Sequence, residues 1–111
     1  MSTPFSAELE ELMRREHLNG LIGRTHLLIL RSVSKGEKCV TEVFDEIKGQ
    51  NYITAPFQVV RATDQLRRLG CVRVMGKKRT GFLAAPTEPT YGVTDLGRTL
   101  LSDLERTYGK A

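Results

Sequence analysis

The fold is decided by one stretch of the sequence, Val59-Val60-Arg61-Ala62-Thr63-Asp64-Gln65-Leu66-Arg67-Arg68-Leu69-Gly70-Cys71-Val72. Apolar side chains recur in it at helical spacing and predict a buried face: Val59, Ala62, Leu66 and Leu69. The opposite side carries polar, charged and aromatic groups: Phe57, Arg61, Asp64 and Arg68, with Val60 and Arg67 nearby and Gln58 and Gln65 on a flank. Thr54 is the predicted N-cap, Pro56 lies in the first turn and Gly70 follows the last. The pattern predicts an amphipathic helix over residues 55–69.

A strand, a basic turn and a returning strand are predicted after this helix. Residues 71–75 are strand-like, and residues 76–81 form a turn rich in Lys and Arg between two glycines. A long loop over 82–90 contains Pro86 and Pro89, and residues 90–93 return as a second strand. Thr94 is the predicted N-cap of a last helix over 95–108, which has leucines along one side.

Three more helices are predicted before the deciding stretch. The first spans residues 6–18, with Ser6 as its cap and glutamates in its opening turns. The second, over 24–34, is apolar on most sides and is the predicted central helix. A short extended segment over 37–40 precedes a third helix over 42–48, with Thr41 as its N-cap. The turn from Gly49 to Pro56 is longer than a typical turn between two such helices.

Length and composition restrict the class of protein. The chain has 111 residues, of which 40% are hydrophobic, so we expect one domain over residues 1–111 with a modest core. No apolar run approaches the length of a membrane span, and the N-terminus lacks the pattern of a secretory signal. We therefore expect a cytoplasmic protein that does not contact a membrane. Cys39 and Cys71 are expected to be core thiols, in preference to a redox switch.

The positive charge is local. The chain has 17 basic and 13 acidic residues, a net charge of +4. Residues 61–79 alone hold +6, because Asp64 is their single acid: the basic residues are Arg61, Arg67, Arg68, Arg73, Lys77, Lys78 and Arg79. A solvated basic face is one interpretation of such a helix. A helix that exposes arginines, followed by a cationic hairpin, also matches the major groove and phosphates of duplex DNA.

Two segments of the chain resemble the winged helix-turn-helix family, most closely the PadR/MarR type of bacterial and archaeal regulators. One is the deciding stretch, Val59 to Val72. The other is Tyr91-Gly92-Val93-Thr94-Asp95-Leu96-Gly97-Arg98-Thr99-Leu100-Leu101, which is similar to the join between wing and dimerisation helix in that family. The resemblance implies a mainly helical α+β fold, with a three-helix core and β-hairpin wing over 24–93, flanked by helices over 6–18 and 94–108.

The resemblance also implies which residues bind DNA. The helix over 55–69 is expected to enter the major groove, with Gln58 and Arg61 reading bases and with Thr54 and Phe57 contacting phosphate and thymine methyl groups. Phe57 has a second interpretation, as a cap on the core. Further contacts are expected from Gln65 and from a wing tip of Lys77, Lys78 and Arg79. Arg67, Arg68 and Arg73 are expected to be phosphate ligands or to have a partly structural role.

Family members usually dimerise through their terminal helices, which implies a homodimer here. The expected contact residues are Phe5, Leu9, Leu12, Leu96, Leu100, Leu104 and Tyr108. The same apolar stripes could instead close the core of one chain. A two-fold dimer would place two reading helices about 34 Å apart, on a palindromic or direct-repeat site.

The sequence indicates a binding protein in preference to an enzyme. It contains no GxSxG, P-loop, HExxH or paired Cys/His motif, so no catalytic residue, metal or cofactor is expected. His26 is expected to be satisfied by a neighbour within the core. The leading hypothesis is a dimeric, sequence-specific regulator of transcription, a repressor, near the bacterial or archaeal nucleoid. The alternatives are a plasmid or virus centromere- or replication-associated protein that coats repeated sites, and a winged-helix module for protein contacts. A small-molecule effector is left open.

Overall fold

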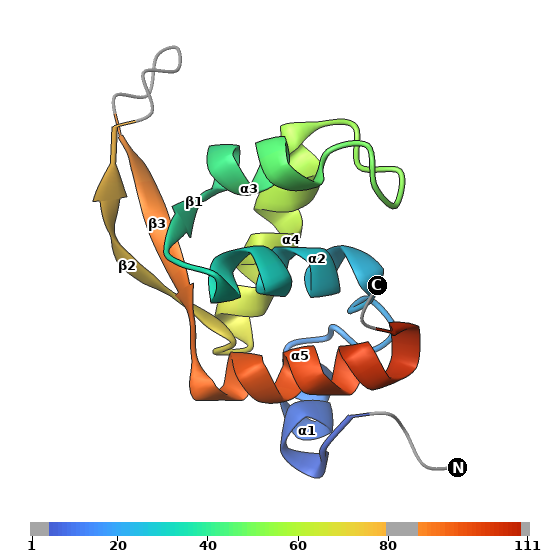
Figure 1. Ribbon diagram of the computed structural model, residues 1–111. Coiled ribbons are helices and arrows are strands. Elements are labelled where there is room, and N and C mark those ends of the chain that lie inside the picture. Colours follow the sequence, from blue (N-terminus) through green and yellow to red (C-terminus); the bar gives the residue numbers. More distant parts are fainter. Residues whose placement is uncertain (1–4, 80–86, 110–111) are drawn as a thin grey trace.

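The computed structural model describes residues 5–79 and 87–109, and it contains helices and strands in the predicted order. In chain order they are α1 (Ala7–Arg15), α2 (Arg24–Ser34), β1 (Lys38–Cys39), α3 (Val40–Ile47), α4 (Pro56–Arg68), β2 (Val72–Lys78), β3 (Glu88–Val93) and α5 (Asp95–Tyr108). Helices α2, α3 and α4 followed by a β-hairpin form the winged helix-turn-helix arrangement. Helices α1 and α5 flank it (Figure 1).

Three predicted helix ends are confirmed by their hydrogen bonds. Ser6 Oγ accepts from the N–H of Leu9 at 3.4 Å, and Thr94 Oγ1 accepts from the N–H of Gly97 at 3.0 Å. Gly70 follows α4 with a φ of +80°, a left-handed conformation that glycine adopts without strain. Helix α1 is shorter than predicted, because the chain leaves the helix after Arg15 and His17 adopts a φ of +58°.

Two predicted N-caps are wrong, for one physical reason. In α3 and α4, a side chain three residues into the helix bonds back to the backbone and makes a threonine cap unnecessary. Glu42 Oε1 accepts from the N–H of Cys39 at 3.1 Å, so α3 begins at Val40 and contains Thr41. Helix α4 begins at Pro56, with Ala55 and not Thr54 as its N-cap residue.

The three strands form an antiparallel sheet in the order β1-β3-β2. Strand β1 pairs with β3 through Lys38 opposite Tyr91 and Cys39 opposite Thr90. Strand β2 is longer than predicted: Lys77 and Lys78 pair with Pro89 and Glu88, after an irregularity between Val74 and Gly76. The predicted turn over 76–81 and loop over 82–90 are therefore wrong in part, because their ends belong to strands. Residues 80–86 of that turn and loop lie outside the described residues.

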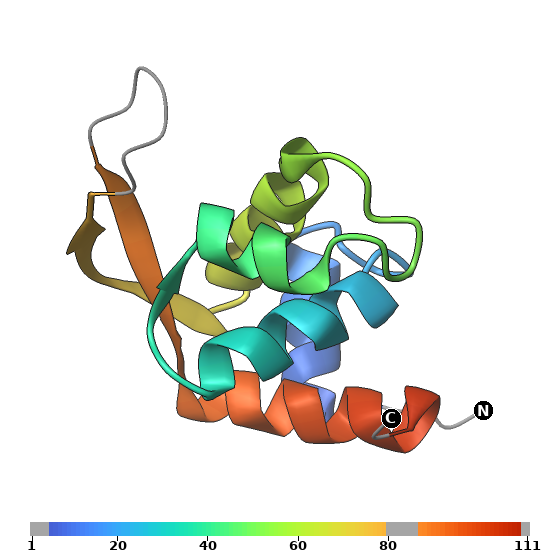
Figure 2. The same ribbon diagram turned by 45° about the horizontal axis from the view of Figure 1, so that its top comes forward.

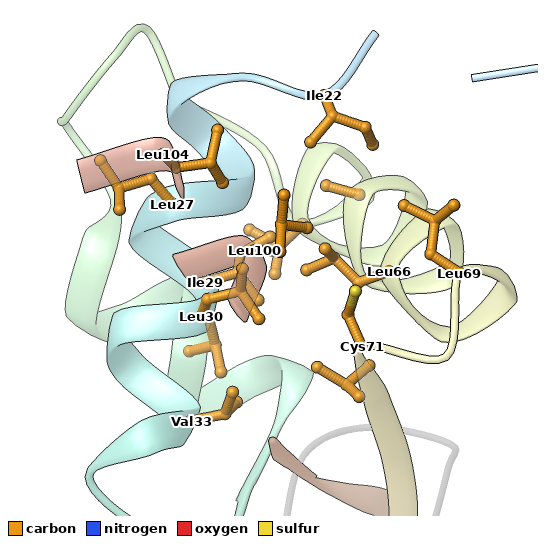
Figure 3. Packing of buried hydrophobic residues seen from close by; sticks show 14 of the residues in the cluster. Ile22, Leu27, Ile29, Leu30, Val33, Leu66, Leu69, Cys71, Leu100 and Leu104 are labelled. Carbon is orange, nitrogen blue, oxygen red and sulfur yellow. The ribbon is translucent and has the colours of Figure 1, made fainter. Parts of the chain in front are cut away.

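The core joins α2, α4 and α5. Leu100 of α5 lies between leucines of α2 on one side and leucines of α4 on the other (Figure 3). The predicted inner face of α4 is confirmed, since these residues are at most 4% exposed: Val59, Ala62, Leu66 and Leu69. Burial of these apolar surfaces fixes the inner face of α4 and leaves its other side to solvent.

A close backbone contact fixes the C-terminal end of α4 to the start of α5. The hydroxyl of Thr94 donates to the carbonyl of Gly70 at 2.6 Å, and the N–H of Thr94 donates to the carbonyl of Cys71 at 3.0 Å. Gly97 faces the same carbonyl so closely that a Cβ atom on it would lie 2.0 Å from the oxygen. The junction therefore requires glycine at position 97.

The hairpin and α4 are oriented so that two of their ends lie on one side of the molecule. The distal ends of β2 and β3 and the N-terminal end of α4 both point away from α5 in Figure 1, and the turned view in Figure 2 agrees. One extended surface can therefore contact both. In the part of the chain that the structure describes, no helix combines the length and apolar character needed to cross a bilayer.

Candidate nucleic-acid interface

The N-terminal end of α4 exposes an unusual group of side chains. Phe57 is 60% exposed and Val60 is 51% exposed, and Arg61 lies beside them on the same helical face. The guanidinium carbon of Arg61 lies 5.8 Å from the centre of the Phe57 ring, within the range of a cation–π contact. No carboxylate among residues 5–79 and 87–109 forms an ion pair with Arg61. The exposure of Phe57 also argues against the alternative that it caps the core.

The amide of Gln58 is occupied by the backbone before α4. Its Oε1 accepts from the N–H groups of Thr54, at 2.7 Å, and Ala55, at 2.9 Å. Its Nε2 donates to the carbonyl of Tyr52 at 3.2 Å. The amide therefore orders the entry to α4, and it would have to break these bonds to read a base. Thr54 is exposed, with its N–H already bound.

The other predicted amide, Gln65, is bound to a buried histidine. His26 is 5% exposed, and its Nε2 lies 2.8 Å from Oε1 of Gln65. Its Nδ1 accepts from the N–H of Gly23 at 3.0 Å, so the proton of the neutral ring lies on Nε2. Burial lowers the pKa of His26, and the bond to Gln65 opposes this in part. The prediction that a neighbour satisfies His26 is confirmed.

The C-terminal end of α4 pairs its own charges. Arg67 Nη2 lies 2.8 Å from one carboxylate oxygen of Asp64, and Arg68 Nε lies 3.6 Å from the other. All three side chains are about half exposed, so water weakens these pairs. One carboxylate thus partly offsets two guanidinium groups, which lowers the field that this end presents to an anion.

The basic residues of β2 and the adjacent Arg79 are all exposed, but they are not equivalent. Arg73, Lys77, Lys78 and Arg79 face solvent. Lys78 forms an ion pair with Glu42 of α3, and the ammonium group lowers the pKa of that carboxyl. Lys77 has no ion pair among the described residues. The prediction that Lys77 and Lys78 form the tip of the wing is wrong, because both lie in the paired part of β2.

Sequence reasoning missed several exposed apolar groups around α4. Tyr52 is 91% exposed and Leu21 is 55% exposed. A hollow of about 260 Å³ beside α4 is lined by Leu21, Thr25, His26, Phe57, Gln58, Arg61, Ala62 and Gln65. The helical wheel did indicate Val60, since it is an apolar residue on the polar side. Nothing in the local sequence indicated Leu21.

The residues predicted to form a dimer contact divide into two groups. Three have no exposed surface and lie in the core of a single chain: Leu9, Leu100 and Leu104. They cannot line an interface unless that core opens. Phe5, Leu12 and Leu96 are partly buried against the same core, and Tyr108 is 40% exposed. For the first group, the alternative that the terminal helices close the core of one chain describes the structure better.

Neither cysteine has the setting of a reactive thiol. Cys39 and Cys71 are both buried and unpaired, and burial raises the pKa of Cys71 to about 12. Within residues 5–79 and 87–109, no cluster of three His, Cys, Asp or Glu side chains has the arrangement of a metal site.

Comparisons with known proteins show the fold. No protein-family model matches the chain, and no curated protein matches it in sequence. Among solved structures it is similar to NolR from Sinorhizobium fredii, with 24% sequence identity and a TM-score of 0.57 over 99% of this chain and 100% of that one. Together with the helices and sheet described above, this likeness confirms the predicted fold, a mainly helical winged helix.

Proposed function

We propose that this protein is a sequence-specific DNA-binding regulator of transcription that inserts α4 into the major groove of duplex DNA. One observation carries the proposal: the N-terminal end of α4 exposes Phe57, Val60 and Arg61, while its opposite face is fixed in the core. The major groove admits an α-helix, and the first turns of such a helix contact the base edges. Arginine is the side chain that most often recognises guanine there.

The hairpin supplies a second contact in this proposal. The distal end of its basic strand β2 and the N-terminal end of α4 lie on one side of the molecule (Figures 1 and 2), so both can contact one duplex. The proposed phosphate ligands are Arg73 and Lys77 of β2 and Arg79, which directly follows the strand, because all three are exposed. Lys78 is a weaker candidate, since Glu42 already offsets its charge.

We further propose that the protein acts as a homodimeric repressor at the nucleoid. The proposal follows from the resemblance of its sequence to PadR/MarR-type regulators, and Tyr108 together with the partly buried Phe5 and Leu12 are the proposed contact residues. Sedimentation equilibrium tests the dimer. A single species with the mass of one chain at micromolar concentration would contradict it.

The first experiment measures binding to a random-sequence duplex by fluorescence anisotropy. Salt is varied from about 50 to 200 mM, because contacts to phosphates weaken steeply over this range. We expect the logarithm of affinity to fall linearly with the logarithm of salt concentration. Arg61→Ala is compared with Arg98→Ala, which removes another exposed arginine, from α5. No binding at the lowest salt, followed by no enriched site in a selection from random duplexes, would contradict the proposed function.

A second candidate function, docking to another protein, has one observation in its favour. Tyr52, Phe57 and Val60 expose more apolar surface near the start of α4 than phosphate binding requires. Salt distinguishes the two functions, because apolar contacts persist at concentrations that abolish binding to phosphates.

A further inference from the structure

The structure leaves few side chains of α4 available for reading bases. Gln58 is bonded to the backbone before the helix, and Gln65 is bonded to His26. Farther along the helix, Asp64 pairs with both neighbouring arginines. The exposed groups that remain at the N-terminal end are the Phe57 ring, the Val60 methyl groups and the Arg61 guanidinium.

These three groups match two features of the major groove. The guanidinium fork forms paired hydrogen bonds with O6 and N7 of guanine, and an apolar side chain contacts the C5 methyl group of thymine. Adenine is usually read by an Asn or Gln amide, and both amides of α4 are occupied. The helix is therefore equipped for guanine and for a methyl group.

The spacing of the ring and the guanidinium joins these two features into one short element. The guanidinium carbon of Arg61 lies 5.8 Å from the centre of the Phe57 ring. Neighbouring base pairs of B-DNA are separated by about 3.4 Å along the axis. Two groups this close reach the same base pair or adjacent ones, so they read neighbouring positions.

We propose, on the basis of the function proposed above, that Phe57 and Arg61 act as one reader of a guanine with a 5-methylpyrimidine at the adjacent base pair. Thymine and 5-methylcytosine both present this methyl group. The ring supports the guanidinium by the cation–π contact and itself covers the methyl group, with Val60 enlarging the apolar surface. Affinity for a guanine next to a 5-methylpyrimidine therefore depends on both Phe57 and Arg61.

The test uses duplexes of about two dozen base pairs, roughly two helical turns, that repeat one dinucleotide. Every binding register then presents the same neighbouring bases. In alternating d(TG)·d(CA), each guanine has a thymine next to it on the same strand. In alternating d(GA)·d(TC), the thymine of the adjacent base pair lies on the opposite strand. Each is compared, at one fixed salt concentration, with the duplex in which every thymine is replaced by deoxyuridine. The replacement removes only the methyl group, so we expect about fourfold weaker binding in at least one alternation.

In a second pair of duplexes a methyl group is added to a pyrimidine and not removed from it. Alternating d(CG) is compared with the same duplex carrying 5-methylcytosine at every cytosine. We expect methylation to strengthen binding by about the same factor, because it adds the methyl group beside each guanine. Replacing guanine by 7-deazaguanine removes N7 and is expected to weaken binding about tenfold in the wild type and less in Arg61→Ala, which has no donor for N7.

Variants then assign the effect to its residue. Phe57→Ala is expected to bind the thymine and deoxyuridine duplexes equally, and Phe57→Leu is expected to retain part of the difference. Circular dichroism checks that both variants are folded, as expected for a side chain that is 60% exposed. Arg98→Lys is the control and should leave the difference unchanged.

Two outcomes overturn the proposal without touching the proposed function. One is salt-dependent binding with equal affinity for thymine and deoxyuridine duplexes in both alternations. The other is a difference that persists undiminished in Phe57→Ala. If the protein binds none of these duplexes at any salt concentration and a selection from random duplexes enriches no site, the proposed function itself fails, and this reader fails with it.

Discussion

The two ends of α4 are built in opposite ways. The C-terminal end is fixed by Gly70, Cys71 and Thr94 to the start of α5, and its arginines are paired with Asp64. The N-terminal end exposes Phe57 and Arg61, and Arg61 has no ion pair among the described residues. One short helix is thus attached to the rest of the fold at one end and exposes side chains without an ion pair among the described residues at the other.

The largest expected effect is a loss of stability at the C-terminal end of α4, where it is fixed to α5. Gly97→Ala places a methyl group where a Cβ would lie 2.0 Å from the Cys71 carbonyl oxygen, so α5 must move away from α4. We expect the free energy of unfolding to fall by about 3 kcal/mol, at the upper end of overpacking effects. Urea denaturation measures it, with Arg98→Ala as a control on an exposed turn of the same helix. An unchanged midpoint would show that the junction yields easily.

The next effect concerns the open end. Arg61→Ala is expected to cost about 1–3 kcal/mol in binding to a selected site and to relax the preference at one base pair. Arg68→Ala should cost less and weaken all duplexes alike, since Asp64 already neutralises part of its charge. Anisotropy titrations on matched and mutated sites give both values. Equal losses of binding affinity for the two variants would show that the N-terminal and C-terminal ends of α4 do not differ in this respect.

A third variant makes the fixed end resemble the open end. Asp64→Asn removes the carboxylate that pairs with Arg67 and Arg68, so both guanidinium groups become available to phosphates. We expect non-specific affinity to rise and the slope of log affinity against log salt to steepen by about one. Stability should stay near that of the wild type, because exposed ion pairs contribute little. A weaker binder would indicate that Asp64 itself contacts the DNA.

The same contrast between paired and unpaired cations recurs on β2. Lys77→Ala is expected to reduce the salt slope by about one, as for a residue that contacts one phosphate. Lys78→Ala should reduce it less, because Glu42 already pairs with that ammonium group. The double variant Glu42→Gln with Lys78→Ala serves as a control for the pair. Equal slopes for the two single variants would mean that the ion pair opens on binding.

The smallest expected effect concerns the bond between Gln65, on a flank of α4, and the buried His26. Burial lowers the pKa of His26 below its usual 6.5, so the unfolded chain takes up the proton first as the pH falls. We therefore expect this residue to contribute stability above pH 6.5 and to lose it as the pH falls through the folded pKa. Urea midpoints between pH 7.5 and 5 should fall less steeply in His26→Gln. Parallel curves would exclude the contribution.

Much of the fold was predictable because its signals are local. The spacing of Val59, Ala62, Leu66 and Leu69 predicted the inner face of α4, and Gly70 predicted its end. The Thr94 cap was likewise predictable from sequence. The pairing of Asp64 with Arg67 and Arg68 also follows from spacings of three and four residues on a helix. A sum of the charges over residues 61–79 does not contain this pairing.

The rest depended on contacts between distant residues. The bond from His26 to Gln65 spans 39 positions, and that from Lys78 to Glu42 spans 36. Neither has a signature within one helix or strand. The burial of Leu9, Leu100 and Leu104 in one chain follows from how α1 and α5 pack on the core. A leucine stripe alone is equally suited to a core and to a dimer contact.

The small strand β1 also bears on how the chain folds. Helices α1 to α4 form from neighbours in sequence, but β1 pairs with β3, and the Thr90 hydroxyl donates to a Glu37 carboxylate 53 positions away. Such a contact closes a long loop, whose entropy must be overcome before the contact stabilises anything. The two residues of β1 therefore add to the contact order of a mainly helical chain, and closure of the sheet is expected to slow its folding.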